Sequence, residues 1–73
     1  MPLFADRHDA VVYALIHGHV CTTPEEARSK YDLAGLADVI VERRFMRGGE
    51  VLYYVDPRDA QDVGGIAPGY LVA

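Results

Sequence analysis

Residues 32–55 of the chain read DLAGLADVIVERRFMRGGEVLYYV, and the fold is expected to form around them. Their first part predicts a helix over residues 33–45, because its apolar side chains recur with the three- and four-residue spacing of one helical face. That face consists of Leu33, Leu36, Ala37, Ile40, Val41 and Phe45. Asp32 is expected to cap this helix, since its side-chain oxygen can accept an N–H group of the first turn.

The second part of the stretch predicts a β-hairpin over residues 45–55. Gly48 and Gly49 are expected to form a two-residue type I′ turn, which needs positive φ at both central positions. The segment EVLYYV that follows is rich in β-branched and aromatic residues, as strands are. Strand alternation places Tyr53 and Tyr54 on opposite faces, so at least one of them is expected to be exposed.

The segment before this stretch predicts two further helices. The first covers residues 6–17, with Asp6 as its N-cap and Gly18 at its end. Leu3 and Phe4 are expected to fold back onto the core as an N-terminal anchor.

The second of these helices covers residues 24–31 and has the clearest start signal in the chain. Thr23 stands at the N-cap, Pro24 at the first helical position and Glu26 at the third, which together form a capping box. Only a short break separates this helix from the next, so the two are expected to cross at a steep angle.

Length and composition favour one small folded domain. A chain of 73 residues buries only about 60% of its unfolded surface, so its stability margin is expected to be thin. The single Cys21 excludes an internal disulfide and favours a reducing compartment. No apolar run approaches the roughly 18 residues of a membrane span, and the N-terminus lacks the pattern of a signal peptide. A soluble cytoplasmic protein is therefore expected.

Three helices followed by a charged hairpin resemble the winged helix-turn-helix family of small bacterial and phage proteins. The resemblance lies in the segments TPEEARSKY (23–31), DLAGLADVIVERRF (32–45) and FMRGGEVLYYV (45–55). It implies an α+β, three-helix domain over residues 1–56, with a two-stranded wing and a short C-terminal extension. In that family the third helix enters the DNA major groove and the wing contacts the backbone or minor groove. The resemblance therefore implies DNA contacts for Arg43, Arg44 and Arg47.

The charge distribution argues against DNA as the first choice of partner. The chain has a net charge of −4, and only the segment around the hairpin is net positive. Asp38 and Glu42 lie four residues apart, so a helix through both would set two carboxylates side by side on its outward face. Like charges facing the duplex oppose the electrostatic term that supplies most non-specific affinity.

A protein partner is therefore expected first, and duplex DNA is the alternative. Electrostatic complementarity would speed the encounter with a basic partner, and tyrosine is a favoured interface residue. The expected contact residues are Asp38, Val39, Glu42, Arg43, Tyr53 and Tyr54. The alternative for the two tyrosines is burial, one on the helical core and one against the C-terminal tail. By analogy with small phage and mobile-element proteins, the chain is expected to regulate or inhibit a larger host complex.

The sequence also bears on two other classes of function, metal binding and enzymatic catalysis. His17, His19 and Cys21 stand at alternate positions, so an extended chain would turn all three to one side as metal ligands. The simpler interpretation is a helix-terminal imidazole, a loop histidine and a small buried thiol, and no metal or cofactor is expected. The sequence has no phosphate loop, nucleophile elbow or paired-carboxylate motif, so it is not expected to be an enzyme.

The tail, residues 57–73, is the least determined segment. Residues 57–63 predict a single helical turn that Gly64 and Gly65 would end. The apolar residues beyond are expected to pack on the hairpin or on a second copy of the chain, which leaves a homodimer open.

Overall fold

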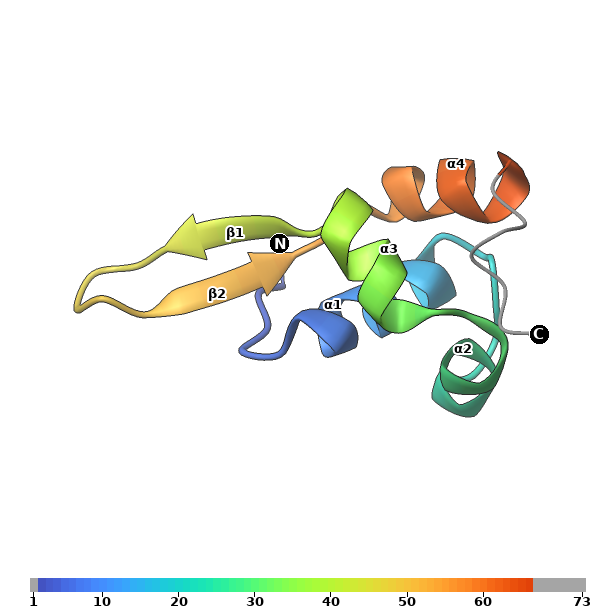
Figure 1. Ribbon diagram of the computed structural model, residues 1–73, viewed down its shortest axis with the longest axis horizontal. Coiled ribbons are helices and arrows are strands. Elements are labelled where there is room, and N and C mark those ends of the chain that lie inside the picture. Colours follow the sequence, from blue (N-terminus) through green and yellow to red (C-terminus); the bar gives the residue numbers. More distant parts are fainter. Residues whose placement is uncertain (1, 67–73) are drawn as a thin grey trace.

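The computed structural model describes the backbone of residues 2–66 and the side chains of residues 2–61. Its elements in chain order are α1 (Arg7–His17), α2 (Pro24–Lys30), α3 (Leu33–Ile40), β1 (Glu42–Phe45), β2 (Val51–Tyr54) and α4 (Pro57–Ile66). The fold is α+β, with the helices gathered at one end and the hairpin projecting from them (Figure 1). Within the described range, no helix has the length and apolar character needed to cross a membrane.

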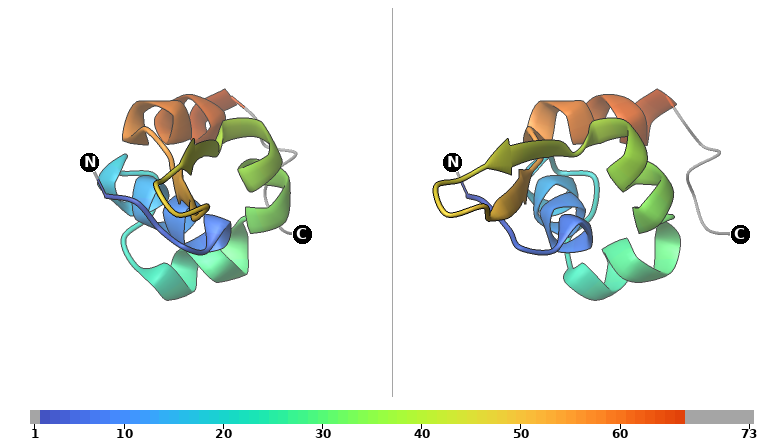
Figure 2. Two further views of the ribbon diagram at one scale, coloured as in Figure 1. Left: turned by 90° about the vertical axis from the view of Figure 1, so that its left-hand side faces the viewer. Right: turned by 60° about the vertical axis from the view of Figure 1, so that its left-hand side comes forward.

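Helix α1 is the centre of the packing. It contacts α2, α3, α4 and β2, and Figure 2 shows it lying among the other helices. Val11 and Leu15 of α1 and Leu36 of α3 are the largest fully buried side chains. The expected apolar face of residues 33–40 is confirmed, because Leu33, Leu36, Ala37 and Ile40 are all buried.

The helix starts follow the sequence signals. Asp6 accepts the His8 N–H at 2.7 Å, and Asp32 accepts the Gly35 N–H at 3.2 Å. Thr23 accepts the Glu26 N–H at 3.1 Å, as a capping box requires. The reciprocal half of that box is wrong, because the Glu26 carboxylate accepts the hydroxyl of Thr22 instead.

The expected helix over residues 33–45 is wrong in its second half. Helix α3 ends at Ile40, where the Val41 N–H closes the last turn on the carbonyl of Ala37, and the chain continues as strand β1. Consecutive β-branched residues weaken the helix at this point, since their side chains crowd the preceding turn. Pairing with β2 then supplies the backbone hydrogen bonds that a longer helix would have supplied.

Strand β2 has neighbours on both edges. It pairs antiparallel with β1, and the register sets Arg43 opposite Tyr53 and Phe45 opposite Val51. On its other edge, Phe4 and Tyr53 exchange two backbone hydrogen bonds, both 2.8 Å long. The predicted N-terminal anchor is confirmed for Phe4, which also packs against the core.

The hairpin turn is one residue longer than expected. Gly48 and Gly49 both have positive φ, at 87° and 85°, as the sequence predicts. The Gly49 N–H, however, donates to the Met46 carbonyl, and the Met46 N–H donates to the Glu50 carbonyl, so residues 47–49 form the loop. A two-residue loop would shift the pairing of β1 with β2 by one residue.

The C-terminal segment forms a longer helix than the single turn expected. Helix α4 runs through Gly64 and Gly65 to Ile66 and packs on α1, with Ala60 completely buried in the shared core. The approach is close, because a Cβ atom at Gly18 would lie 2.6 Å from the Pro57 carbonyl oxygen. The predicted contacts of the last apolar residues lie outside the described range.

Truncation of Leu36 to alanine tests the core. Leu36 is 1% exposed, so Leu36→Ala should lower the free energy of unfolding by about 2–5 kcal/mol, through lost burial and the cavity left behind. The matched control on the same helix is Val39→Ala, whose side chain is 56% exposed and whose removal should change stability by about 0.5 kcal/mol or less. Urea unfolding followed by circular dichroism measures both, and similar losses for the two variants would contradict this packing.

Candidate functional site

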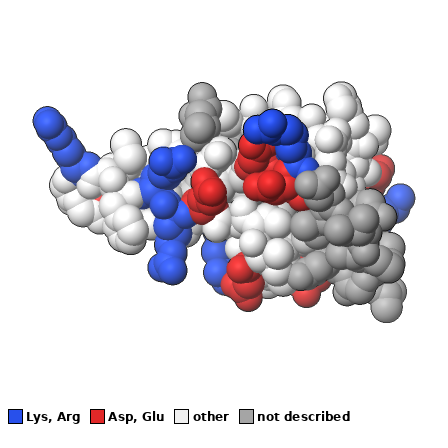
Figure 3. Space-filling view, turned by 90° about the horizontal axis from the view of Figure 1, so that it is seen from above, with Lys and Arg blue, Asp and Glu red and all other residues white. Residues whose placement is uncertain are grey.

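The hairpin is where exposed apolar side chains and arginines come together. Phe45 is 78% exposed and Met46 is 42% exposed. Arg43, Arg44 and Arg47 stand beside them in sequence. Figure 3 shows basic side chains projecting from the hairpin end, and both acidic and basic side chains over the helical part. The projecting end has no helix beneath it, which leaves these apolar groups in water.

The register divides the hairpin into two faces. Cross-strand partners share a face in an antiparallel pair, and neighbours along a strand alternate. The inner face, which meets the helical core, carries Arg43, Phe45, Val51 and Tyr53. The outer face carries Glu42, Arg44, Leu52 and Tyr54.

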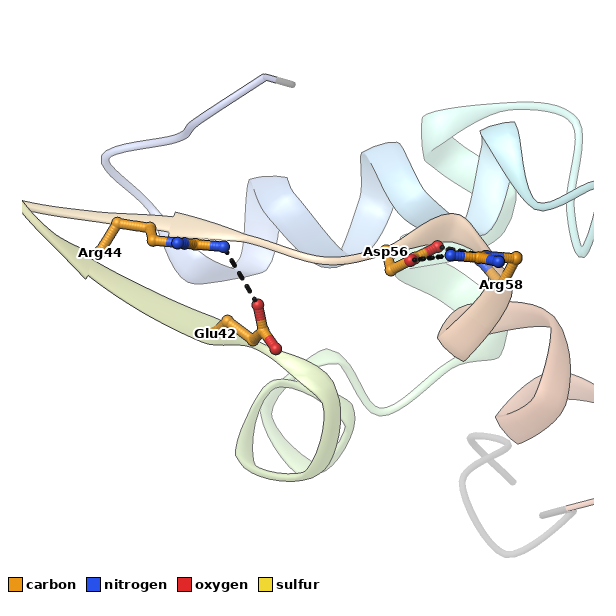
Figure 4. A network of polar contacts seen from close by, with 4 residues as sticks. All are labelled: Glu42, Arg44, Asp56 and Arg58. Carbon is orange, nitrogen blue, oxygen red and sulfur yellow. Dashed lines mark hydrogen bonds and ion pairs between the residues drawn. The ribbon is translucent and has the colours of Figure 1, made fainter.

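The outer face holds a small polar cluster around Arg44. The Arg44 guanidinium lies 5.2 Å from the centre of the Tyr54 ring, a cation–π arrangement. The same guanidinium lies 3.7 Å from a carboxylate oxygen of Glu42 (Figure 4). Glu42 is therefore paired on this face, and Tyr54 is half-buried beneath an arginine.

At the end of the hairpin nearest the helices, the inner face borders a cavity of about 300 Å³. This cavity lies between the start of α1, the end of α3 and the hairpin. Arg7 and Asp38 on its wall form an ion pair with a separation of 3.0 Å. With Arg43, the wall carries two guanidinium groups and one carboxylate. The complete lining is Arg7, Ala37, Asp38, Val41, Arg43 and Tyr53. The cavity therefore has an excess of positive charge.

The structure separates the two acidic residues that were expected side by side. Asp38 lies on α3 and pairs with Arg7, whereas Glu42 lies on β1 and pairs with Arg44. The expected pair of carboxylates on one helical face is therefore wrong, because the helix ends before Glu42.

The predicted contact residues occupy three places. Asp38, Arg43 and Tyr53 line the cavity, and Tyr53 also packs against the core. Glu42 and Tyr54 lie on the outer face, and Val39 is exposed on α3.

Sequence reasoning missed Phe45 and Met46 as surface residues. Phe45 fits the apolar face of a longer helix, so its spacing indicates burial. A signal for the opposite conclusion is present in the strand length. The apolar strand that starts at Val51 needs a partner of equal length, and residues 42–46 are the segment that can supply it.

The proposed metal ligands do not converge. His17 belongs to α1 and its ring stacks on Tyr13 with 3.9 Å between centroids, so the stretch is not extended there. His19 is exposed with a positive φ of 62°, while Cys21 is buried. Burial, with a smaller effect of Glu26, raises the pKa of the Cys21 thiol. In the part of the chain that the structure describes, no group of three or more potential ligands is placed to hold a metal ion.

The passage from the hairpin to α4 is held by Asp56. Its carboxylate accepts the Arg58 backbone N–H at 2.9 Å and pairs with the Arg58 guanidinium at 3.1 Å (Figure 4). The Arg58 side chain is the main reason that the pKa of Asp56 lies below its ordinary value, and the backbone N–H adds to the effect. This contact lies between the end of β2 and the first turn of α4.

Comparison with known proteins gives no match: no protein-family model, no curated protein and no solved structure matches the chain.

The Asp56 carboxylate should make stability depend on pH. Its pKa is lowered in the folded state, so its contribution is present above the ordinary carboxyl pKa of 3.8 and is lost as the pH falls through the lowered value. Wild type should exceed Asp56→Asn in unfolding free energy at neutral pH, and the difference should shrink in acid. Chemical unfolding at several pH values measures this, and Arg58→Gln should reduce the pH dependence. A difference that stays constant with pH would contradict this role.

Proposed function

We propose that this chain is a small non-catalytic binding protein and that its hairpin, residues 42–50, contacts a protein partner. The observation that carries the proposal is the 78% exposure of Phe45, next to Met46 and three arginines. Large exposed apolar groups mark interaction sites when they are clustered. Aromatic residues, methionine and arginine are the types enriched in protein interfaces.

The charge of the hairpin indicates the charge of the partner surface that it would bind. Residues 42–50 carry three arginines against two glutamates, whereas the whole chain has a net charge of −4. An acidic surface on the partner would attract the hairpin and repel the rest of the molecule, which would orient the encounter. We therefore revise the expected basic partner to an acidic one, with an apolar site for Phe45.

The proposed architecture is a variant of the winged helix. A short link joins α2 to α3, and a projecting hairpin follows α3 directly, as in that family. Two features are additions to the pattern: Phe4 pairs with β2, and α4 covers α1. In this scheme the hairpin is the wing, and the chain regulates or inhibits a larger complex by binding it in a reducing cytoplasm.

The second candidate is DNA binding through the same hairpin. Its support is the pairing of Asp38 with Arg7 and of Glu42 with Arg44, which removes the expected acidic surface. The exposed residues of α3 are Ala34, Asp38 and Val39, which include no side-chain donor for base edges at neutral pH. DNA would therefore be held through its phosphates by the arginines, with little reading of sequence.

Removal of the apolar anchors tests the protein-binding proposal. The double variant Phe45→Ser, Met46→Ser should weaken capture of the partner from a lysate of the source organism about thirtyfold or more, the loss expected when a central interface anchor is removed. The matched control is Val39→Ser, which removes the exposed apolar side chain of α3. Quantitative mass spectrometry of the captured proteins measures both. Equal capture by wild type and the double variant, or loss in the control alone, would overturn the proposal.

Replacement of the arginines tests the DNA candidate. The triple variant Arg43→Ala, Arg44→Ala, Arg47→Ala should abolish binding to a labelled random duplex, and wild-type affinity should fall steeply with salt. The control removes three positive charges elsewhere, in Arg28→Ala, Lys30→Ala, Arg58→Ala, and should retain most of the affinity. Fluorescence anisotropy at low and near-physiological salt measures this. Absence of wild-type binding at low salt would reject DNA as the partner.

A further inference from the structure

The edge of β1 that faces away from β2 presents backbone groups at two residues. The Met46 N–H donates to the Glu50 carbonyl across the hairpin. Hydrogen-bonded and non-bonded pairs alternate in an antiparallel ladder, so Arg44 also bonds across to β2, and Arg43 and Phe45 turn their N–H and C=O groups outward. The bridge between Phe4 and Tyr53 supports this alternation. Tyr53 stands opposite Arg43, and its own N–H and C=O groups bond to Phe4 on the side away from β1.

No strand covers this edge in the part of the chain that the structure describes. The sheet consists of β1 and β2, and the additional bridge to Phe4 lies on the far edge of β2. An edge with free donors and acceptors is a template for a further strand. The four residues of β1 are all exposed, so the template is accessible.

The side chains of the same two residues define what such a strand would carry. Arg43 and Phe45 both belong to the inner face and are two residues apart, the repeat of one face of a strand. A strand added to this edge would place alternate side chains directly opposite them. The complement is a carboxylate opposite Arg43 and an apolar side chain opposite Phe45.

We propose that the free edge of β1 takes up one extended strand of an acidic protein partner, with Asp or Glu opposite Arg43 and an apolar residue two positions away opposite Phe45. The added strand would bond to the outward N–H and C=O groups of both residues, which supply affinity, while the two side chains supply selectivity. This inference rests on the proposed protein-binding function and specifies how the hairpin makes the contact.

The cavity beside Arg43 suits the carboxylate of that strand. Arg7 and Arg43 both line it. One guanidinium nitrogen of Arg7 donates a hydrogen bond to the Asp38 carboxylate, with 3.0 Å between the nitrogen and the oxygen. A second carboxylate would bring the wall to two cations and two anions, so its charge would be balanced. A basic side chain would instead enter beside two guanidinium groups.

A second copy of this chain fits the edge less well than an acidic partner. A symmetric pair of β1 strands must match outward residues with outward residues, which leaves three registers. In the first two registers the two-fold axis passes through Arg43 or through Arg44, so that arginine faces the same arginine of the second copy. In the third register the axis passes through Phe45, so Arg43 faces Arg47 of the second copy. Like charges directly opposite each other destabilise a strand pair. Residues 67–73 contain no Asp or Glu to place opposite Arg43.

The test uses peptides and a change confined to the backbone. Random peptides displayed on phage are selected on the immobilised full-length chain, and the enriched peptides are synthesised with a fluorescent label. The 73-residue chain is made by chemical ligation at Cys21, with N-methyl-phenylalanine at position 45. N-methylation keeps the side chain but removes the outward N–H and blocks the edge, and it should leave the stability of the hairpin unchanged. The matched control carries N-methyl-threonine at position 22, which is exposed in the loop before α2 and lies outside the hairpin.

The expected result has two parts. Enriched peptides should share Asp or Glu with an apolar residue two positions away, and N-methylation at position 45 should weaken their binding about tenfold or more. The control at position 22 should bind like wild type. Fluorescence anisotropy measures the affinities, and thermal unfolding verifies that each chain is folded.

Several results would overturn strand addition. One is unchanged affinity after N-methylation at position 45, and another is a set of enriched peptides without the acidic and apolar pair. If Phe45→Ser, Met46→Ser still weakens those peptides, the hairpin remains the contact site and only the strand addition fails. If that variant also has no effect, the proposed function fails with it. A dimer in sedimentation experiments that N-methylation at position 45 dissociates would assign the edge to a second copy and reject the acidic partner.

Discussion

Burial of α1 is the constraint on which the rest of the structure depends. A chain of this length has room for one core, and α1 supplies its centre through Val11 and Leu15. Each of the other helices and strand β2 contacts α1, so each finds its place by covering part of one helix. Gly18 permits a close approach of α4, because a side chain there would meet the backbone at the start of that helix. The termination of α1 and the attachment of α4 are thus coupled at one residue.

The same constraint explains why the hairpin is exposed. Tyr53 packs against the core and Val55 is buried in it, and these contacts fix the register of β2. Positions nearer the turn extend past the helices, so Phe45 and Met46 remain in solvent although their side chains are apolar. Exposure of this kind brings no benefit to folding, since burial of Phe45 would stabilise the domain by about 1.5–3 kcal/mol. A contact with another molecule is the use that the observations support best.

The fold changes which charged side chains lie next to one another. Asp38 and Glu42 form a repulsive pair if residues 33–45 are read as one helix, but in the fold each has an arginine partner. Arg43 belongs to neither ion pair, and it lines the same cavity as Arg7 and Asp38. The distribution of charge therefore favours an acidic partner at the hairpin over a basic partner at α3, and it leaves nucleic acid phosphates as the competing anion.

Local signals in the sequence determined the helix starts, the positive φ of the two turn glycines and the apolar face of α3. The starts of α1, α2 and α3 are capped by the side chains of Asp6, Thr23 and Asp32, each of which accepts an N–H group no more than three residues later. Such contacts can be predicted from residues that are close together in the sequence. The end of α3 at Ile40 depended on tertiary structure. Residues 41–45 fit a helical face through Val41 and Phe45, and they also fit a strand, because four-residue spacing satisfies both periods. Pairing with β2 and the packing of β2 on α1 decided between them, and that decision placed Phe45 in solvent rather than in the core.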